Sequence, residues 1–202
     1  MEKNKKPTAP LRALDAQRLP ELIRELLFEI GEDPKREGLV DTPRRVAETW
    51  HFFTQGYGQD IGELLAGAIF EDSHDGIVLV KDIDFYSLCE HHLVPFFGNC
   101  HIGYVPDKKI IGLSKIARVV EVYSRRLQVQ ERFTNQIADA LQTHLEPRGV
   151  AVLVEARHLC MSMRGVEKHN AAVTTSALRG CFEKDAPLRS EFFAQLSGPR
   201  PA

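Results

Sequence analysis

The sequence feature that most constrains the fold is a pair of short segments, residues 89–92 (CEHH) and 158–160 (HLC), which lie far apart in the chain. Cys89 and His92 can bind one metal ion from a single tight turn, and Cys160 can supply a third ligand from a distant strand. Structural zinc sites are closed by four protein ligands, whereas catalytic sites typically keep three and leave one position open. The fold must therefore bring the two segments together, and three protein ligands favour a catalytic site.

Two further histidines, His91 and His158, stand beside these ligands in the sequence. Histidine suits proton transfer near neutral pH because its unperturbed pKa is about 6.5. Three metal ligands and two acid–base candidates together predict a hydrolase. The alternative is a set of core cysteines and surface histidines, but Cys-x-x-His and His-x-Cys in one chain favour a metal site, although the pattern alone does not fix the metal.

Charge and composition exclude several other classes of protein. The formal net charge of −2 argues against a general nucleic-acid binder, and no apolar run is long enough to predict a membrane span. Residues 1–17 are polar and lack the apolar stretch of a signal peptide, so we expect a disordered tail on a cytoplasmic protein. Without an export signal, the four cysteines favour metal binding over disulfides. Cys100 and Cys181 have no ligand-like spacing and are expected to be small buried residues.

Residues 18–75 are predicted to form an N-terminal helical region. Apolar residues recur every three to four positions from about residue 20 to residue 30, as in an amphipathic helix. A second helix should follow, with Asp41 as its cap and Pro43 in its first turn, and end at a glycine at position 56 or 58. Both helices need another surface to cover their apolar faces, either the rest of the chain or a second subunit.

Residues 76–202 change to a mixed pattern of strands and helices. Along residues 150–160 apolar and polar residues alternate, so His158 and Cys160 are expected on one face of a strand. Ser114 is the expected cap of a helix. The other expected elements are strand segments at residues 77–80, 82–86, 99–105 and 171–178, and helices at 133–145 and 189–196. The pattern predicts an α+β fold in which an antiparallel sheet carries helices on one face.

Two polar clusters accompany these elements. Ser114, Lys115 and Arg118 lie in one helical turn, where a helix N-terminus and two cations can form an anion site, and Arg164 can bring another guanidinium near Cys160. A solvated basic helix face explains the first cluster equally well.

Gln130 and Glu131 form the second cluster, at the start of a helix. A carboxylate with a neighbouring amide can bind a donor-rich heterocycle such as guanine. From the residues alone, a polar helix start in which Glu131 interacts favourably with the helix dipole is the preferred interpretation.

Several segments, taken in order, resemble the GTP cyclohydrolase I family. The matching stretches are residues 31–47, 85–92, 111–116, 128–132 (QVQER), 158–165 and 174–176, and the resemblance extends from about Pro20 to Leu196. One departure is Leu127, where the family often has proline. The departure should alter the turn between two helices and leaves the functional positions intact.

The resemblance implies a tunnelling fold (T-fold), with residues 76–202 as the catalytic domain. In this family the antiparallel sheets of several subunits close into a barrel, two pentamers stack into a decamer, and the active sites lie between subunits. The reaction converts GTP and water to 7,8-dihydroneopterin triphosphate and formate, as the first step of folate and pterin biosynthesis.

The resemblance also implies a role for each candidate residue. One Zn²⁺ per subunit is held by Cys89, His92 and Cys160. His158 gives a proton to N7 of the guanine, and His91 and Ser114 assist ring opening and the rearrangement of the ribose. The expected contacts to GTP are Gln130 and Glu131 at the guanine edge, and Lys115, Arg118 and Arg164 at the triphosphate.

Two other classes compete with this prediction. A structural zinc protein would need a fourth protein ligand, and His91 is the only spare residue nearby, although adjacent residues rarely bind one ion together. A relative on the same fold, such as a reductase of a deazapurine nitrile, would not need Cys89, His92 and Cys160. The three ligands therefore favour the cyclohydrolase.

Overall fold

A computed structural model describes residues 17–72 and 74–198 of the chain. The predicted tail, residues 1–17, therefore lies outside the described residues apart from Gln17. No helix in the described part of the chain is long and apolar enough to cross a membrane.

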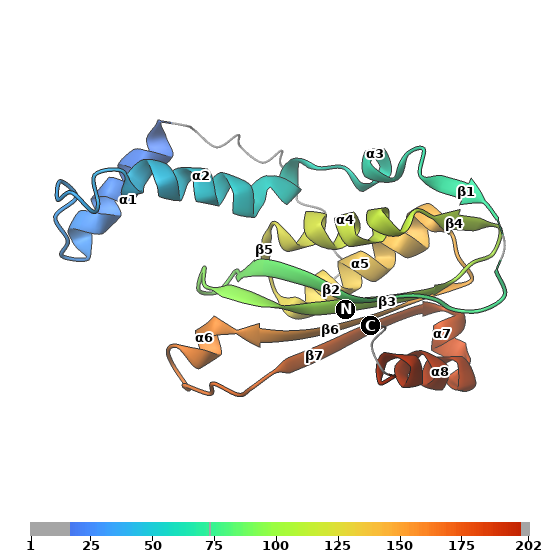
Figure 1. The fold of residues 1–202 in the computed structure, drawn as a ribbon. Helices are drawn as coiled ribbons and strands as arrows, with labels where there is room; N and C mark the ends of the chain where they lie inside the picture. Colours follow the sequence, from blue (N-terminus) through green and yellow to red (C-terminus); the bar gives the residue numbers. More distant parts are fainter. Residues whose placement is uncertain (1–16, 73, 199–202) are drawn as a thin grey trace, which may run out of the picture.

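The centre of the molecule is a five-stranded sheet with the strand order β5-β2-β3-β6-β7 (Figure 1). Its strands are β2 (Val78–Cys89), β3 (Pro95–Val105), β5 (Leu127–Gln128), β6 (Gly149–His158) and β7 (Val173–Gly180). All neighbouring pairs are antiparallel except β2 with β5, which is parallel. A separate two-stranded sheet joins β1 (Ile69–Glu71) to β4 (Lys109–Ile111), so residues 18–75 contain a strand as well as helices.

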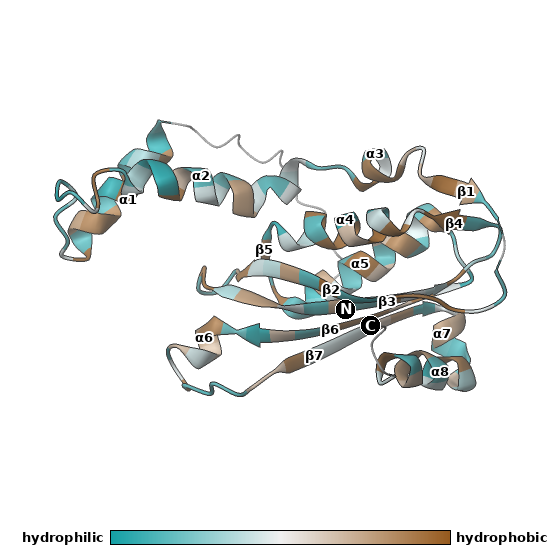
Figure 2. Cartoon of the chain, viewed as in Figure 1, coloured by the Kyte–Doolittle hydropathy of each residue, from teal (hydrophilic) through white to brown (hydrophobic). Residues whose placement is uncertain are grey.

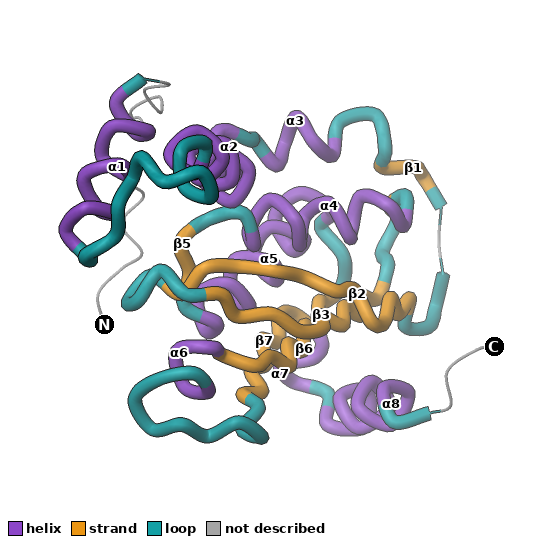
Figure 3. The backbone as a smooth tube through the Cα atoms, turned by 60° about the vertical axis from the view of Figure 1, so that its left-hand side comes forward, coloured by secondary structure: helices purple, strands orange, loops and turns teal. Residues whose placement is uncertain are grey.

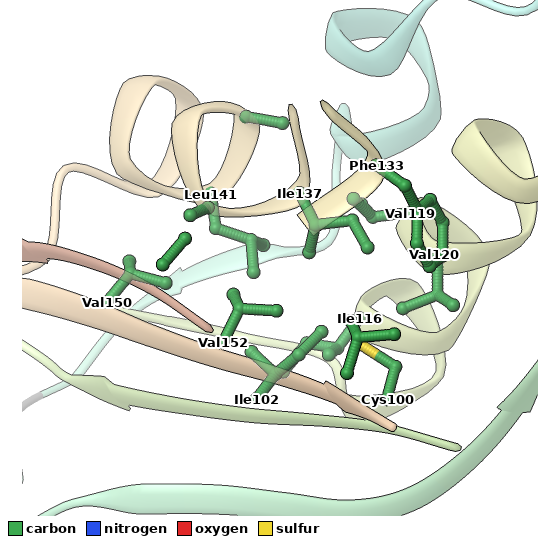
Figure 4. Packing of buried hydrophobic residues seen from close by; sticks show 14 of the residues in the cluster. Cys100, Ile102, Ile116, Val119, Val120, Phe133, Ile137, Leu141, Val150 and Val152 are labelled. Atoms are coloured by element: carbon green, nitrogen blue, oxygen red, sulfur yellow. The ribbon is translucent and has the colours of Figure 1, made fainter. Parts of the chain in front are cut away.

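Two helices, α4 (Leu113–Ser124) and α5 (Gln130–Leu145), cover one face of this sheet, as predicted (Figures 1 and 3). Their apolar residues recur every three to four positions and meet the inward-facing residues of β3 and β6. Figure 4 shows this core, and Figure 2 shows the apolar colouring of the strands that line it. The central side chains are Cys100, Ile102, Ile116, Val119, Val120, Phe133, Ile137, Leu141, Val150 and Val152, all at most 1% exposed. Full burial of one such aliphatic or aromatic side chain stabilises the fold by roughly 1.5–3 kcal/mol.

The opposite face of the sheet is not bare, which corrects the expectation of helices on one face only. The helices α7 (Cys181–Lys184) and α8 (Ala186–Leu196) pack Phe182 and Phe192 against Ala151 and Val105. The first half of β6 is consequently buried on both faces. Cys181 lies in this layer and is partly exposed rather than buried, whereas Cys100 is fully buried as expected.

Two helices form the expected N-terminal helical region, α1 (Arg18–Glu29) and α2 (Thr42–Thr54), and they lie against each other (Figure 3). A turn of 3-10 helix, η1 (Gln55–Gly58), and the short α3 (Ile61–Leu65) follow. Helix α1 has no buried residue, and Leu26 and Phe28 are 54% and 69% exposed. Within the described part of the chain, therefore, α2 covers the apolar face of α1 only in part.

Several boundaries differ from the prediction for physical reasons. The two segments expected at 77–80 and 82–86 are one strand, β2, interrupted by a bulge at Asp82, whose φ is 56°. The bulge shifts the alternation of inward and outward side chains by one residue. In the sequence, this shift looks like the end of one strand and the start of another. Asp41 is the N-cap residue of α2, as predicted, but its side chain makes no capping hydrogen bond, and Ser114 is not the cap of α4. The carboxylate of Asp41 accepts a hydrogen bond from Arg45, and α4 begins at Leu113 with Gly112 as its N-cap, so Ser114 lies inside the first turn.

Helix α2 is joined to the domain through Gly56. Its N–H donates to the carbonyl of Arg125 (3.1 Å), and its own carbonyl accepts from Nε of Arg126 (3.1 Å). A Cβ atom at Gly56 would lie 2.1 Å from the carbonyl oxygen of Val122. Gly58, two residues on, has nothing within 4 Å of the equivalent position. The junction therefore requires a glycine at position 56 and not at position 58.

We expect Gly56→Ala to lower the free energy of unfolding by about 1–3 kcal/mol, because backbone atoms must move to admit the methyl group. Gly58→Ala is the matched control and should be neutral or slightly stabilising, because it restricts the unfolded chain without a clash. Urea denaturation at one fixed protein concentration measures both. Equal stability of the two variants would contradict the close approach of η1 to α4.

Candidate metal centre and active site

The first two predicted metal ligands come from the turn between β2 and β3. Cys89 is the last residue of β2 and is 5% exposed. Its N–H donates to the carbonyl of Val94 (3.0 Å), and its carbonyl accepts from the N–H groups of His92 (3.3 Å) and Leu93 (2.8 Å). These bonds close a tight turn that folds His92 back over Cys89.

The third predicted ligand, Cys160, lies on a different element from the one expected. Strand β6 ends at His158, and Cys160 belongs to the single-turn helix α6 (Leu159–Ser162). The prediction that His158 and Cys160 share one strand face is therefore wrong. The two segments still meet, because antiparallel pairing sets Phe96, next to the β2–β3 turn, opposite His158.

One ligand atom from each of Cys89, His92 and Cys160 lies within 4.8 Å of the other two, and the group contains no fourth His, Cys, Asp or Glu among the described residues. Ligand atoms of a tetrahedral zinc ion are about 3.3–3.8 Å apart, so side-chain shifts of about 1 Å would close the group around an ion. Two thiols and an imidazole are the donors that zinc favours in proteins. The three residues fit a metal ion with one open position.

The neighbours of Cys160 are consistent with this arrangement. Burial and the adjacent Cys89 thiol raise the pKa of Cys160, while the guanidinium of Arg164 acts in the opposite direction. Arg164 thus lies in the neighbourhood of the metal group, as the sequence predicted. A bound metal ion would reverse the raised pKa, because a coordinating thiol is deprotonated.

His158 lies beside the metal group with its ring held on two sides. Its Nε2 is 2.8 Å from Oε1 of Gln130, and its ring stacks on Phe96 with the centroids 4.6 Å apart and the planes 6° from parallel. Burial lowers the pKa of His158, and the carboxylate of Glu131 raises it. The sequence analysis predicted neither the stacking on Phe96 nor the bond to Gln130. The position of Phe96, shortly after the turn that holds Cys89 and His92, could have indicated that Phe96 lies near the site.

His91 is exposed, and its Nδ1 is 3.9 Å from Sγ of Cys89. His91 is therefore close to the metal group without being part of it. Its ring centroid lies 6.3 Å from that of His92.

The predicted guanine contacts, Gln130 and Glu131, point into different environments. Gln130 is 2% exposed, and both polar atoms of its side chain have partners inside the protein. Glu131 is exposed and near His158. Of the pair, Glu131 is the side chain that a ligand can reach.

The predicted anion cluster is not next to the metal group in the same chain. Ser114 and Lys115 lie in the first turn of α4 and Arg118 near its middle, and the far end of α4 leads into β5, which pairs with Cys89 (Figure 1). Ten residues of helix separate the ends by about 15 Å. Nζ of Lys115 donates to the carbonyl of Leu64 (2.6 Å), which holds it at that end.

A polar network of Glu90, Gln128 and Arg132, which the sequence analysis did not predict, supports the β2–β3 turn. The N–H of Glu90 donates to the carbonyl of Gln128 (2.9 Å), and the carboxylate of Glu90 pairs with Arg132. Nε of Arg132 in turn donates to Oε1 of Gln128 (3.2 Å). The N–H of Leu127 donates to the hydroxyl of Tyr57 (3.1 Å), a bond that proline at position 127 could not make.

Comparison with known proteins identifies the family. The model of the family described as GTP cyclohydrolase I matches residues 19–197. The chain is 60% identical over 171 residues to GTP cyclohydrolase 1 of Methylococcus capsulatus, an alignment that covers 85% of this chain and 92% of that relative. It is 58% identical over 174 residues to GTP cyclohydrolase 1 of Dictyostelium discoideum, covering 86% of this chain and 75% of the relative. This family match over nearly the whole length of the chain makes it a member of the GTP cyclohydrolase I family.

Proposed function

We propose that the chain opens the guanine imidazole ring of GTP by hydrolysis, releases formate and forms 7,8-dihydroneopterin triphosphate, with one zinc ion held by Cys89, His92 and Cys160. The observation that carries the proposal is the group of three ligand atoms within 4.8 Å, open at a fourth position and adjacent to a histidine with a fixed ring. As a member of this family, the chain is an enzyme whose substrate is GTP.

The chemistry of the ligand set supports zinc. When bound there, zinc would lower the pKa of a water molecule and so supply a nucleophile near neutral pH. A structural role is disfavoured because such sites use four protein ligands.

His158 is the proposed proton donor to N7 of the guanine. Glu131 beside it favours the charged, donating form of the ring, against the effect of burial. His91 is exposed near Cys89, where it can take part in the proton transfers of ring opening.

Glu131 is the proposed contact to the guanine edge. A carboxylate that accepts two N–H bonds from guanine should reject adenine strongly, because the wrong base leaves a charge unpaired. The internal hydrogen bonds of Gln130 disagree with the expectation that it shares this contact.

The triphosphate is proposed to bind Lys115, Arg118 and Arg164, with Ser114 near the ribose. Arg164 lies near the metal group, but Ser114 and Lys115 lie at the far end of α4 and Arg118 lies near its middle. We therefore propose that each active site combines the metal group of one subunit with the start of α4 of another, in a homodecamer. The exposed apolar side chains of α1, such as Leu26 and Phe28, also suit contact with another copy.

The test of the proposed function is incubation of the zinc-loaded protein with GTP, followed by assays for formate and for the ultraviolet absorption of a dihydropterin. We expect both products, and we expect neither after zinc is stripped with EDTA. Absence of formate from a protein with one zinc per chain would overturn the proposal and favour a structural metal.

Substitution of a metal ligand and substitution of the proton donor should have different effects on zinc content. Cys160→Ser should lose zinc and lower turnover by about 100-fold or more, because it removes a ligand itself rather than a supporting residue. His158→Ala should keep zinc and still lose turnover. Metal analysis and the formate assay measure the two effects.

Cys181→Ser is the control for Cys160→Ser, because it removes another partly exposed free thiol at the opposite end of β6 and β7. It should retain both zinc and turnover. Full activity in Cys160→Ser would refute the ligand assignment.

Sharing of the site between subunits predicts complementation. Lys115→Ala and Cys160→Ser should each be inactive alone, yet their co-expression should recover up to about a quarter of wild-type turnover by random assortment of the two chains in a ring. Turnover of doubly tagged, doubly purified oligomers measures this. If every site were contained in one chain, the mixed oligomers would be as inactive as the parent variants.

A further inference from the structure

The hydrogen bonds around Gln130 fix the orientation of its side-chain amide. Gln130 is the first residue of α5 and is almost fully buried against the sheet. Its Nε2 lies 3.1 Å from the carbonyl oxygen of Val154, 2.9 Å from that of Val173 and 3.2 Å from the hydroxyl of Thr175. Backbone carbonyls only accept hydrogen bonds, so the NH₂ group must face them. The Oε1 atom, which only accepts, must therefore face His158.

This orientation determines which ring nitrogen of His158 carries a hydrogen. Because Oε1 of Gln130 cannot donate, the 2.8 Å contact is a hydrogen bond only if Nε2 of His158 bears the hydrogen. In the opposite tautomer, two acceptors would face each other in a buried place. Nδ1 has no hydrogen-bond partner within the described residues, and stacking on Phe96 holds the plane of the ring.

We propose that Gln130 is a positioning residue that holds His158 as the Nε2–H tautomer, so that Nδ1 is the nitrogen that exchanges a proton with the substrate. The inference rests on the proposed role of His158 in proton transfer. Gln130 then acts through His158 and not at the guanine edge. Of Gln130 and Glu131, only Glu131 contacts the base.

The first turn of α5, which carries Gln130, is itself held by further hydrogen bonds. The hydroxyl of Thr134 donates back to the carbonyl of Gln130 (2.8 Å) and lies 2.7 Å from the hydroxyl of Thr175 on β7. Gln130 is thus linked to β6, to β7 and to its own helix, and it has no freedom to turn toward a ligand without breaking several bonds. A residue held in this way can define the direction of a second side chain.

The first test compares Gln130→Met with Thr175→Val. Methionine has a similar length and no polar group, so it removes the bond to His158. Thr175→Val removes one acceptor near the amide and leaves the bond between Gln130 and His158 in place. For Gln130→Met we expect kcat for formate release to fall by about 10- to 100-fold while KM for GTP changes by less than about threefold. Thr175→Val should stay within about threefold of wild type in both.

Zinc content and the thermal midpoint of each variant are measured alongside. A rise in KM for Gln130→Met with kcat preserved would show that Gln130 contacts the guanine, and wild-type kinetics would show that it does nothing for His158. Either result overturns the proposal.

The second test uses the unaltered zinc-loaded protein and so does not depend on the folding of a variant. Histidine labelled with ¹⁵N allows two-bond correlations between ring protons and ring nitrogens, at a pH where the ring is neutral, and the signals of His158 are those missing from His158→Ala. We expect Nε2 to carry the hydrogen and Nδ1 to be bare. The reverse pattern overturns the proposal. Failure of the wild-type protein to release formate would instead overturn the proposed function, and the tautomer result would stand apart from it.

Discussion

Antiparallel pairing of β3 with β6 is the constraint on which the metal group depends. Ten consecutive residue pairs, from Phe96 opposite His158 to Val105 opposite Gly149, fix the register. A slip of one residue would turn every side chain of one strand to the other face of the sheet. The pairing also needs a close approach at Gly98, where a Cβ atom would lie 1.9 Å from the carbonyl oxygen of Glu155. With the register set, the β2–β3 turn and the end of β6 must meet.

The first turn of α5 is attached to the same strands. Gln130 reaches over the sheet and bonds to carbonyls of β6 and β7, so the helix is fastened to the strand that ends in His158. The residue beside it, Glu131, points away from the sheet and is exposed. One helix start thus presents a buried and an exposed side chain at adjacent positions, because successive residues of a helix are about 100° apart around its axis.

Periodicity made most of the fold predictable. The apolar spacing of α1, α2, α4 and α5 and the alternation of β3 and β6 gave their locations within a few residues. Features that depend on single side chains were less predictable. Asp41 could cap a helix or bind Arg45, and only the surrounding geometry decides between the two. The prediction that the strand continues to Cys160 was wrong for a similar reason. The alternation in the sequence continues past His158, whereas the backbone turns into α6.

The candidate site was predictable where its residues are local and ambiguous where they are not. Cys89 and His92 share one turn, so their spacing carries the information about the metal. The partners of Gln130 come from two strands that follow it in the chain, at Val154 and Val173, and no local pattern indicates them. Resemblance to a family supplied residue names for the guanine contact, but the side chain of Gln130 is bonded to backbone carbonyls and to His158 inside the protein.

The position of Lys115 bears on how subunits could assemble around one active site. Helix α4 is buried along its inner face through Ile116, Val119 and Val120, so its two ends cannot approach each other. Rotation of the Lys115 side chain cannot span the roughly 15 Å that separate the start of α4 from the end that leads to Cys89. In the proposed assembly, one chain supplies the metal part of one site and the basic part of another. A second copy, placed with its α4 start near this metal group, would bring the two parts together around one triphosphate-bearing substrate.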